Sequence, residues 1–263
     1  MKSRISDETR LKRGLGQGHG ANYKPFIRPR HFSSKGCTTR IAGDAKIDRE
    51  FIVLSNLEEN YSILFRFNPA IKDIQEQYPL LPLSSTQQIA ANLNIIHPHD
   101  EKNKDVVMTT DFLLTVDRAG IMSQKAVTVK PSSLITKRVL QKFQIEKEWW
   151  KQRDVEWCIV TEKQLDQIKL NNVKFLREYF TMDSLLASVV FEEFKRCSLD
   201  KNLLLREFVK QSALKLRIQF GDCCRIFYHL LATQRVWFDI GRSLNLDMQL
   251  FNFKIIADET INK

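Results

Sequence analysis

Apolar side chains recur at helical spacing in the segment that follows Ser55. The positions are Leu57, Tyr61, Leu64 and Phe65, which stand at i, i+4, i+7 and i+8 and share one face of an α-helix. Ser55 suits the N-cap position, where its hydroxyl can accept a backbone hydrogen bond. Asn68 and Pro69 predict the end of this helix, because the residue before a proline avoids the helical conformation.

Extended segments and a second helix follow. Residues 71–78 predict a short strand. Residues 106–116 and 125–130 are rich in β-branched and apolar side chains, and the turn signal DRAG between them predicts a hairpin. After Pro131 the apolar spacing predicts a helix, and residues 156–160 predict a buried strand. The order αβββαβ predicts an α/β fold with one small mixed sheet and flanking helices.

Beyond residue 162 the pattern becomes mostly helical. Apolar periodicity predicts helices at about 163–180, 183–197, 202–216 and 221–233, and extended segments at 236–240 and 248–256. Helices closed by a β-hairpin favour a winged-helix-like module, and a plain helical bundle is the alternative. We therefore predict one domain over residues 51–162 and a second over residues 163–263.

The first fifty residues show no sustained period and are rich in glycine, arginine and turn formers. We interpret residues 1–50 as a basic arm with little structure of its own. The glycines at positions 14, 16, 18 and 20 suggest a phosphate-binding loop, but no strand precedes them and no Lys-Ser or Lys-Thr pair follows. A polar, turn-rich stretch at 83–105 predicts an exposed excursion between two strands.

Composition narrows the class of protein. Apolar residues make up 43% and charged residues 27% of the chain, which is typical of globular domains. No stretch is long and apolar enough for a membrane span, and the N-terminus lacks the apolar run of a secretory signal. The five cysteines form an odd set without CxxC spacing, which argues against a disulfide framework and a zinc ribbon. These features favour a reducing cytoplasm.

The net charge of +10 is unevenly distributed. Residues 1–50 carry 12 basic and 5 acidic side chains, residues 51–160 carry 13 of each, and residues 161–263 carry 16 basic against 13 acidic. Basic flanks around a neutral centre suit a polyanion such as a nucleic acid, and a solvated surface is the alternative interpretation.

Polar residues on the predicted hairpin suggest hydrolysis of a phosphodiester. Such a reaction needs hard carboxylate ligands that converge on one divalent cation. If the two extended runs pair, strand alternation places Thr128 and Lys130 on one face of the sheet, beside Asp111. A lysine there can polarise the attacking water, and the Val129 carbonyl can complete the metal shell. Each residue also has a structural interpretation, because polar residues at strand ends are often simply exposed.

Glu58 lies in the first turn of the predicted helix, where its carboxylate can lean toward the same metal. The residue also completes a capping box with Ser55, in which its side chain would bond back to the Ser55 amide. On local pattern alone, capping is the favoured interpretation of Glu58. Glu76 is a weaker candidate for a supporting ligand, and the histidines show no metal-ligand spacing beyond HPH.

Five blocks of sequence carry a resemblance to a known family. They are RGLGQGHGANYKPFI, LSNLEE, DIQEQYPLLP, VVMTTDFLLTV and AVTVKPS, and they run in order across most of residues 13–160. At these blocks the chain resembles TnsA, the endonuclease subunit of heteromeric cut-and-paste transposases. The resemblance implies a restriction-endonuclease-like fold for residues 51–162. It also implies catalytic roles for Glu58 of the LE motif, Asp111 of the TDF motif and Lys130 of the VKP motif.

The resemblance further implies a cofactor and partners. Mg²⁺, for which Mn²⁺ can substitute, would bind Glu58, Asp111, Thr128 and Val129. The substrate would be double-stranded DNA at transposon ends, cut at the 5′ strands beside a TnsB-like transposase that processes the 3′ strands. Residues 163–263, as a winged-helix-like interaction domain, would contact a TnsC-like ATPase regulator. The protein would act in the cytoplasm, at the nucleoid.

One departure from the family concerns Thr128, a position where the family commonly has glutamine. The shorter hydroxyl puts a metal contact at this position in question and supports an alternative function, a non-catalytic DNA-binding adaptor of the same fold. A second alternative is a resolvase or repair nuclease, which would differ in its DNA substrate.

Overall fold

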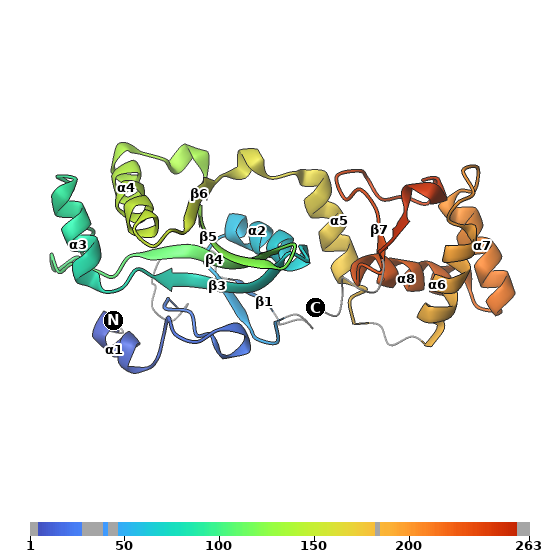
Figure 1. The fold of residues 1–263 in the computed structure, drawn as a ribbon, viewed down its shortest axis with the longest axis horizontal. Coiled ribbons are helices and arrows are strands. Elements are labelled where there is room, and N and C mark those ends of the chain that lie inside the picture. Colours follow the sequence, from blue (N-terminus) through green and yellow to red (C-terminus); the bar gives the residue numbers. More distant parts are fainter. Residues whose placement is uncertain (1–4, 28–38, 42–46, 182–184, 257–263) are drawn as a thin grey trace. The chain divides into compact units, whose positions relative to one another are not determined.

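A four-stranded mixed sheet forms the centre of the N-terminal half of the chain in the computed structural model (Figure 1). Its strands are β3 (Ile71–Pro79), β4 (Thr109–Arg118), β5 (Ile121–Val129) and β6 (Glu156–Val160), in that spatial order. β4 pairs antiparallel with both β3 and β5, and β6 joins β5 in parallel. Ala119 and Gly120 turn the β4–β5 hairpin with positive φ angles of 54° and 85°, so the predicted hairpin is confirmed.

Helices cover both faces of this sheet. α2 (Asn56–Phe67) places Tyr61 in one core together with Phe112. α4 (Lys137–Lys151), the crossover between the parallel strands β5 and β6, places Ile145 in a second core together with Leu113. The neighbouring residues Phe112 and Leu113 thus serve different cores, as strand alternation requires. The predicted αβββαβ order is confirmed apart from an additional helix between β3 and β4, and the mixed sheet with its helices forms a restriction-endonuclease-like core.

The structure describes residues 5–27, 39–41, 47–181 and 185–256, and the chain divides into two compact units, Met1–Leu165 and Asp166–Lys263. The sequence pattern placed the division after residue 162. In the second unit the described helices are α5 (Gln167–Arg177), α6 (Leu185–Cys197), α7 (Leu205–Leu216) and α8 (Phe220–Ala232), and the strands β7 (Val236–Trp237) and β8 (Lys254–Ile255) pair antiparallel.

The core of the second unit is rich in phenylalanine. Phe194, Phe208 and Phe227 lie ring against ring, with centroids 5.7 to 6.0 Å apart. The predicted helical C-terminal region is confirmed. The extended segments predicted at 236–240 and 248–256 are shorter in the structure, which has only the two-residue strands β7 and β8 there and a 3-10 helix at Leu250–Asn252. Among the described residues of the whole chain, no helix combines the length and apolar character that a membrane span requires.

The described N-terminal residues differ from the predicted arm. They contain α1 (Asp7–Lys12) and a loop that buries Leu15 and Phe26 in a small core with Val107. The Tyr23 hydroxyl donates a hydrogen bond to a carbonyl of β3. Residues 5–27 therefore pack on the sheet domain, and the interpretation as an arm with little structure is wrong for them.

This packing depends on glycine turns and not on an apolar period, which explains why the sequence pattern missed it. Gly16 has a φ of 79°, and a Cβ at this position would lie 2.4 Å from the Pro79 ring. Two short strands, β1 (Thr39–Ile41) and β2 (Phe51–Val53), pair antiparallel before α2 begins. The other parts of the predicted arm, residues 1–4, 28–38 and 42–46, lie outside the described residues.

The predicted excursion at 83–105 also contains regular structure. α3 (Leu83–Asn92) packs Ile89 and Ala90 into the same core as Ile145 and Trp149 of α4. The apolar positions of α3 are few among its serines and glutamines, so packing against α4, and not intrinsic periodicity, stabilises this helix. The prediction of an exposed excursion is wrong for α3.

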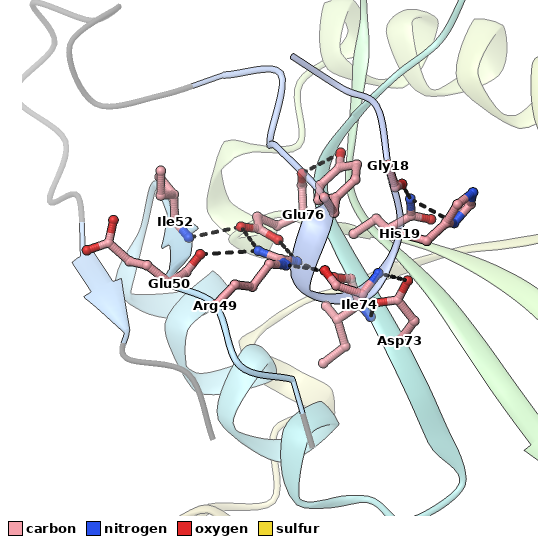
Figure 2. Close-up of polar contacts among 11 residues, drawn as sticks. Gly18, His19, Arg49, Glu50, Ile52, Asp73, Ile74 and Glu76 are labelled. Atoms are coloured by element: carbon pink, nitrogen blue, oxygen red, sulfur yellow. Dashed lines mark hydrogen bonds and ion pairs between the residues drawn. The ribbon is translucent and has the colours of Figure 1, made fainter. Parts of the chain in front are cut away.

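A buried ion pair ties three segments of the chain together beside β3 (Figure 2). The Arg49 guanidinium donates to both carboxylate oxygens of Glu76, at 2.8 and 2.6 Å, and the two side chains are 7% and 0% exposed. Arg49 also donates to the carbonyls of Gly20 and Ile74, and the Ile52 amide donates to Glu76. Glu76, the weaker candidate ligand, thus holds the N-terminal segment and β2 against β3.

Candidate active site

Glu58 lies in the first turn of α2, where the N-cap fixes its carboxylate. Oε2 accepts a hydrogen bond from the Leu54 amide at 2.9 Å, and Oε1 accepts one from the Ser55 hydroxyl at 2.9 Å. The Ser55 oxygen in turn accepts from the Glu58 amide at 3.1 Å, so the predicted N-cap is confirmed. Glu58 bonds one residue earlier than a capping box requires, and it is 7% exposed.

Asp111 lies on β4 at a point where the alternation of the strand breaks. Thr110 and Phe112 are two residues apart and would share a face of a regular strand. Thr110 instead donates to Glu146 on α4, whereas Phe112 packs in the core beneath α2. At this irregularity the Asp111 carboxylate accepts a hydrogen bond from the Val129 amide of the neighbouring strand, at 2.7 Å.

The Gln77 side chain joins the two carboxylates. Its amide nitrogen donates to Glu58 Oε2 at 3.2 Å and to Asp111 Oδ1 at 3.4 Å. Gln77 is 2% exposed and has a positive φ of 52° within β3. Two acidic side chains that are far apart in the sequence, one on α2 and one on β4, therefore meet at one point beside the sheet.

Burial favours the neutral, protonated form of both acids. It raises the pKa of Glu58, against the opposing effects of the Leu54 and Ser55 hydrogen bonds and of the positive charge of Lys130. Burial, and then the charge of Glu58, raise the pKa of Asp111 well above its ordinary value. Lys130 directly follows β5, and its charge reaches Glu58. The structure thus brings Glu58 and Asp111 together, with Lys130 directly after β5 and its charge acting on Glu58, and the catalytic role of all three residues stays a prediction.

The Thr128 side chain does not lie beside the Asp111 carboxylate, where the sequence predicted it. Its hydroxyl donates to Glu146 Oε1 at 2.6 Å and accepts from the Trp157 indole at 3.1 Å, on the α4 side of the sheet. The prediction that Thr128 stands beside Asp111 is therefore wrong. Val129 approaches Asp111 instead, through its backbone amide. The Val129 carbonyl stays a candidate ligand, whereas the Thr128 hydroxyl is engaged by Glu146.

Two polar residues near the site were not identified from the sequence. Gln77 lies in the DIQEQYPLLP block, but nothing local indicates which side chains a strand glutamine will meet. Glu146 is 3% exposed and accepts from the Thr110 and Thr128 hydroxyls at 2.6 Å each, and burial raises its pKa. The only sequence signal for the burial of Glu146 is its position next to Ile145. The helical pattern alone does not distinguish a buried acid at this position from an exposed one.

The donor set suits a hard divalent cation. Carboxylate oxygens of Glu58 and Asp111 converge in a part-buried place, and Mg²⁺ and Mn²⁺ prefer such oxygen ligands. Within the described ranges, no group of three or more His, Cys, Asp or Glu side chains could hold a metal ion. A cation at this site would therefore need neutral oxygens, such as a backbone carbonyl and water, to complete its shell.

Comparisons with known proteins concern mainly the N-terminal half of the chain. Residues 68–162 match the family model described as TnsA-like endonuclease N terminal. This segment contains Asp111 and Lys130, and Glu58 precedes it. The chain is also 35% identical over 175 residues to the Transposon Tn7 transposition protein TnsA of Escherichia coli. That match covers 66% of this chain and 63% of the relative, so the chain spans less than two thirds of the relative's length.

The family match coincides with the mixed sheet that carries the site. The family match begins at the end of α2 and includes β3, β4, β5, α4 and β6. The resemblance to TnsA is thereby confirmed, and it is carried by residues 68–162, which are similar to the N-terminal domains of TnsA-like endonucleases.

Proposed function

We propose that this chain is a metal-dependent DNA endonuclease that works as a subunit of a heteromeric transposase. The observation that carries the proposal is the meeting of the Glu58 and Asp111 carboxylates near the Lys130 charge, in a chain with a TnsA-like endonuclease domain. Phosphodiester hydrolysis needs this combination of hard ligands and a nearby cationic group. The similar protein is a transposition protein, which supports transposon ends as the substrate.

Each residue of the site has a distinct proposed role. Glu58 and Asp111 would hold Mg²⁺, or Mn²⁺ in its place, with the Val129 carbonyl and water completing the shell. The cation would supply charge neutralisation at the phosphate and a lowered pKa for the attacking water. Lys130 would orient that water with its ammonium and offset the charge that develops on the phosphate. Hydrogen bonds from the Leu54 amide and the Ser55 hydroxyl keep the Glu58 carboxylate in place when no cation is bound.

The distribution of charge supports a duplex DNA substrate. The chain carries a net charge of +10. Its first fifty residues carry 12 basic against 5 acidic side chains. Phosphate contacts give affinity without reading sequence, so recognition of the ends would belong to a TnsB-like transposase that processes the 3′ strands. This chain would hydrolyse the 5′ strands, and residues 163–263 would contact a TnsC-like ATPase regulator.

The experiment is 5′ strand cleavage at a transposon end by the assembled transposase with Mg²⁺. We expect Lys130→Ala to lower the cleavage rate at least about 100-fold without affecting assembly, because its ammonium acts on the reacting groups. Lys125→Ala is the matched control, since Lys125 lies on β5, which Lys130 directly follows, and pairs with Glu156. It should cut at the wild-type rate, whereas wild-type cutting by Lys130→Ala would reject the proposal.

A non-catalytic DNA-binding adaptor is the second candidate, and Thr128 favours it. The hydroxyl of Thr128 is directed at Glu146, so position 128 offers no side-chain ligand to a cation beside Asp111. An adaptor would support assembly and DNA binding and leave the 5′ strands intact. Cleavage of those strands by the wild-type protein in the same assay separates the two candidates.

A further inference from the structure

Gln77 is the amide that contacts both carboxylates of the candidate site. Its nitrogen lies 3.2 Å from Glu58 Oε2 and 3.4 Å from Asp111 Oδ1, and the residue is 2% exposed. Position 128 supplies no amide, because its residue is a threonine whose hydroxyl bonds to Glu146. The side chain that bridges the two acids therefore comes from β3 and not from position 128.

The backbone at Gln77 adopts a conformation that L-residues rarely take. Its φ of 52° lies in the left-handed region, although Gln77 is not a glycine and lies inside β3. Such a conformation persists where the surrounding contacts over-determine it. Those contacts are present, because the preceding Glu76 is held by Arg49 and the Ile52 amide (Figure 2), and the following Tyr78 pairs with β4.

A neutral amide suits the space between two acids. Two buried carboxylates repel each other and lose hydration, which favours a donor that reaches both. A lysine in this place would neutralise the acids and compete with a cation, whereas an amide donates hydrogen bonds and adds no charge. The amide therefore holds the two carboxylates and leaves their charge available to a divalent ion.

We propose that Gln77 is a positioning residue that sets the spacing of the Glu58 and Asp111 carboxylates before a divalent cation binds. This inference rests on the proposed function, because it concerns the same cation site. Gln77 acts through the two carboxylates. Loss of its amide should therefore change cation binding and the rate of cleavage and leave the binding of DNA unchanged.

Mn²⁺ binding to the full chain, measured by isothermal titration calorimetry, tests this role. Gln77→Met keeps the length of the side chain and removes the amide, and we expect the affinity for Mn²⁺ to fall about 10- to 100-fold. Gln75→Met is the matched control, because Gln75 lies on the same strand and donates to Gly18. Its affinity should equal that of the wild type.

Cleavage by the assembled transposase provides a second readout. The kcat of Gln77→Met should fall by at least about tenfold, while KM for DNA stays within about twofold of the wild type. A purely structural role would disturb the whole site, so a KM for DNA that rises in Gln77→Met as much as kcat falls would overturn the inference. Wild-type affinity in Gln77→Met would overturn it as well. Failure of the wild type itself to bind Mn²⁺ would instead overturn the proposed function, so the two failures are distinguishable.

Discussion

At the residue scale, the candidate site is a place where the fold tolerates an electrostatic cost. Glu58 and Asp111 meet at the Gln77 amide, and burial raises the pKa of both acids. Functional sites commonly keep such unfavourable groupings because the ligand relieves them. The metal-free protein should therefore become more stable when one of the two acids is replaced by a neutral side chain.

Asp111→Asn should stabilise the metal-free protein at pH 8 by about 0.5–2 kcal/mol, because it removes one of two repelling charges. The folded wild type holds protons that the unfolded chain has already released, so its stability falls as pH rises from about 4 through the raised pKa values. The advantage of Asp111→Asn should grow over this range and vanish near pH 4. Thermal unfolding in EDTA at pH 4 to 8 measures it.

Asp117→Asn is the control for this experiment. Asp117 lies on the same strand and accepts a hydrogen bond from Gly120 in the exposed hairpin. Its replacement should give no pH-dependent gain. A loss of stability in Asp111→Asn at pH 8 would contradict the account of the carboxylate pair.

The sequence predicted part of the site, and the failures have one physical cause. The strand pattern identified Asp111 and Lys130 and the resemblance decided for Glu58, and the structure brings the Glu58 and Asp111 carboxylates together at the Gln77 amide. Thr128 was misplaced because the argument assumed a regular β4. On a regular strand Asp111 would share the α4 side of the sheet with Leu113 and Thr128, and the irregularity turns it to the other side. Sequence alternation cannot indicate where a strand becomes irregular.

At the element scale, β3 connects the N-terminal segment to the candidate site. Glu76 accepts from Arg49 and from the Ile52 amide of β2, and the next residue along the strand is Gln77. Removal of one partner of a buried ion pair leaves an uncompensated charge, which costs more than the loss of the contact alone. Removal of Arg49 alone should therefore destabilise the N-terminal unit far more than the replacement of both partners.

Arg49→Met should destabilise the N-terminal unit by about 3–5 kcal/mol, because Glu76 would remain buried without its cation. The double variant Arg49→Met/Glu76→Gln should recover most of this loss. Urea unfolding of the full chain measures both.

Arg118→Met is the control, since its pair with Glu156 is 67% and 54% exposed and should contribute less than about 1 kcal/mol. Similar losses in Arg49→Met and Arg118→Met would show that the buried pair is not essential.

The elements that the sequence predicted correctly are those with a strong local signal. The apolar stripe and N-cap of α2 and the turn of the β4–β5 hairpin needed only neighbouring residues. α3 and residues 5–27 were missed because contacts with distant parts of the chain stabilise them, such as Ile89 with Trp149 and Phe26 with Val107. These contacts become visible only once the sheet is known.

At the scale of the whole molecule, the chain combines a sheet unit that carries the candidate site with a mostly helical unit. The change from mixed to helical periodicity predicted this organisation from the sequence. The family match ends at residue 162, within the first unit. The proposed cleavage chemistry therefore belongs to the first unit, and contacts with a regulator are proposed for the second.

The central claim is that Glu58 and Asp111 together hold one divalent cation. Equilibrium dialysis of the full chain against Mn²⁺ at pH 8, where both acids can release their protons to a cation, tests it most directly. The account predicts about one Mn²⁺ per chain for the wild type and for Asp117→Asn, and none for Asp111→Asn. Retention of the Mn²⁺ by Asp111→Asn would contradict it.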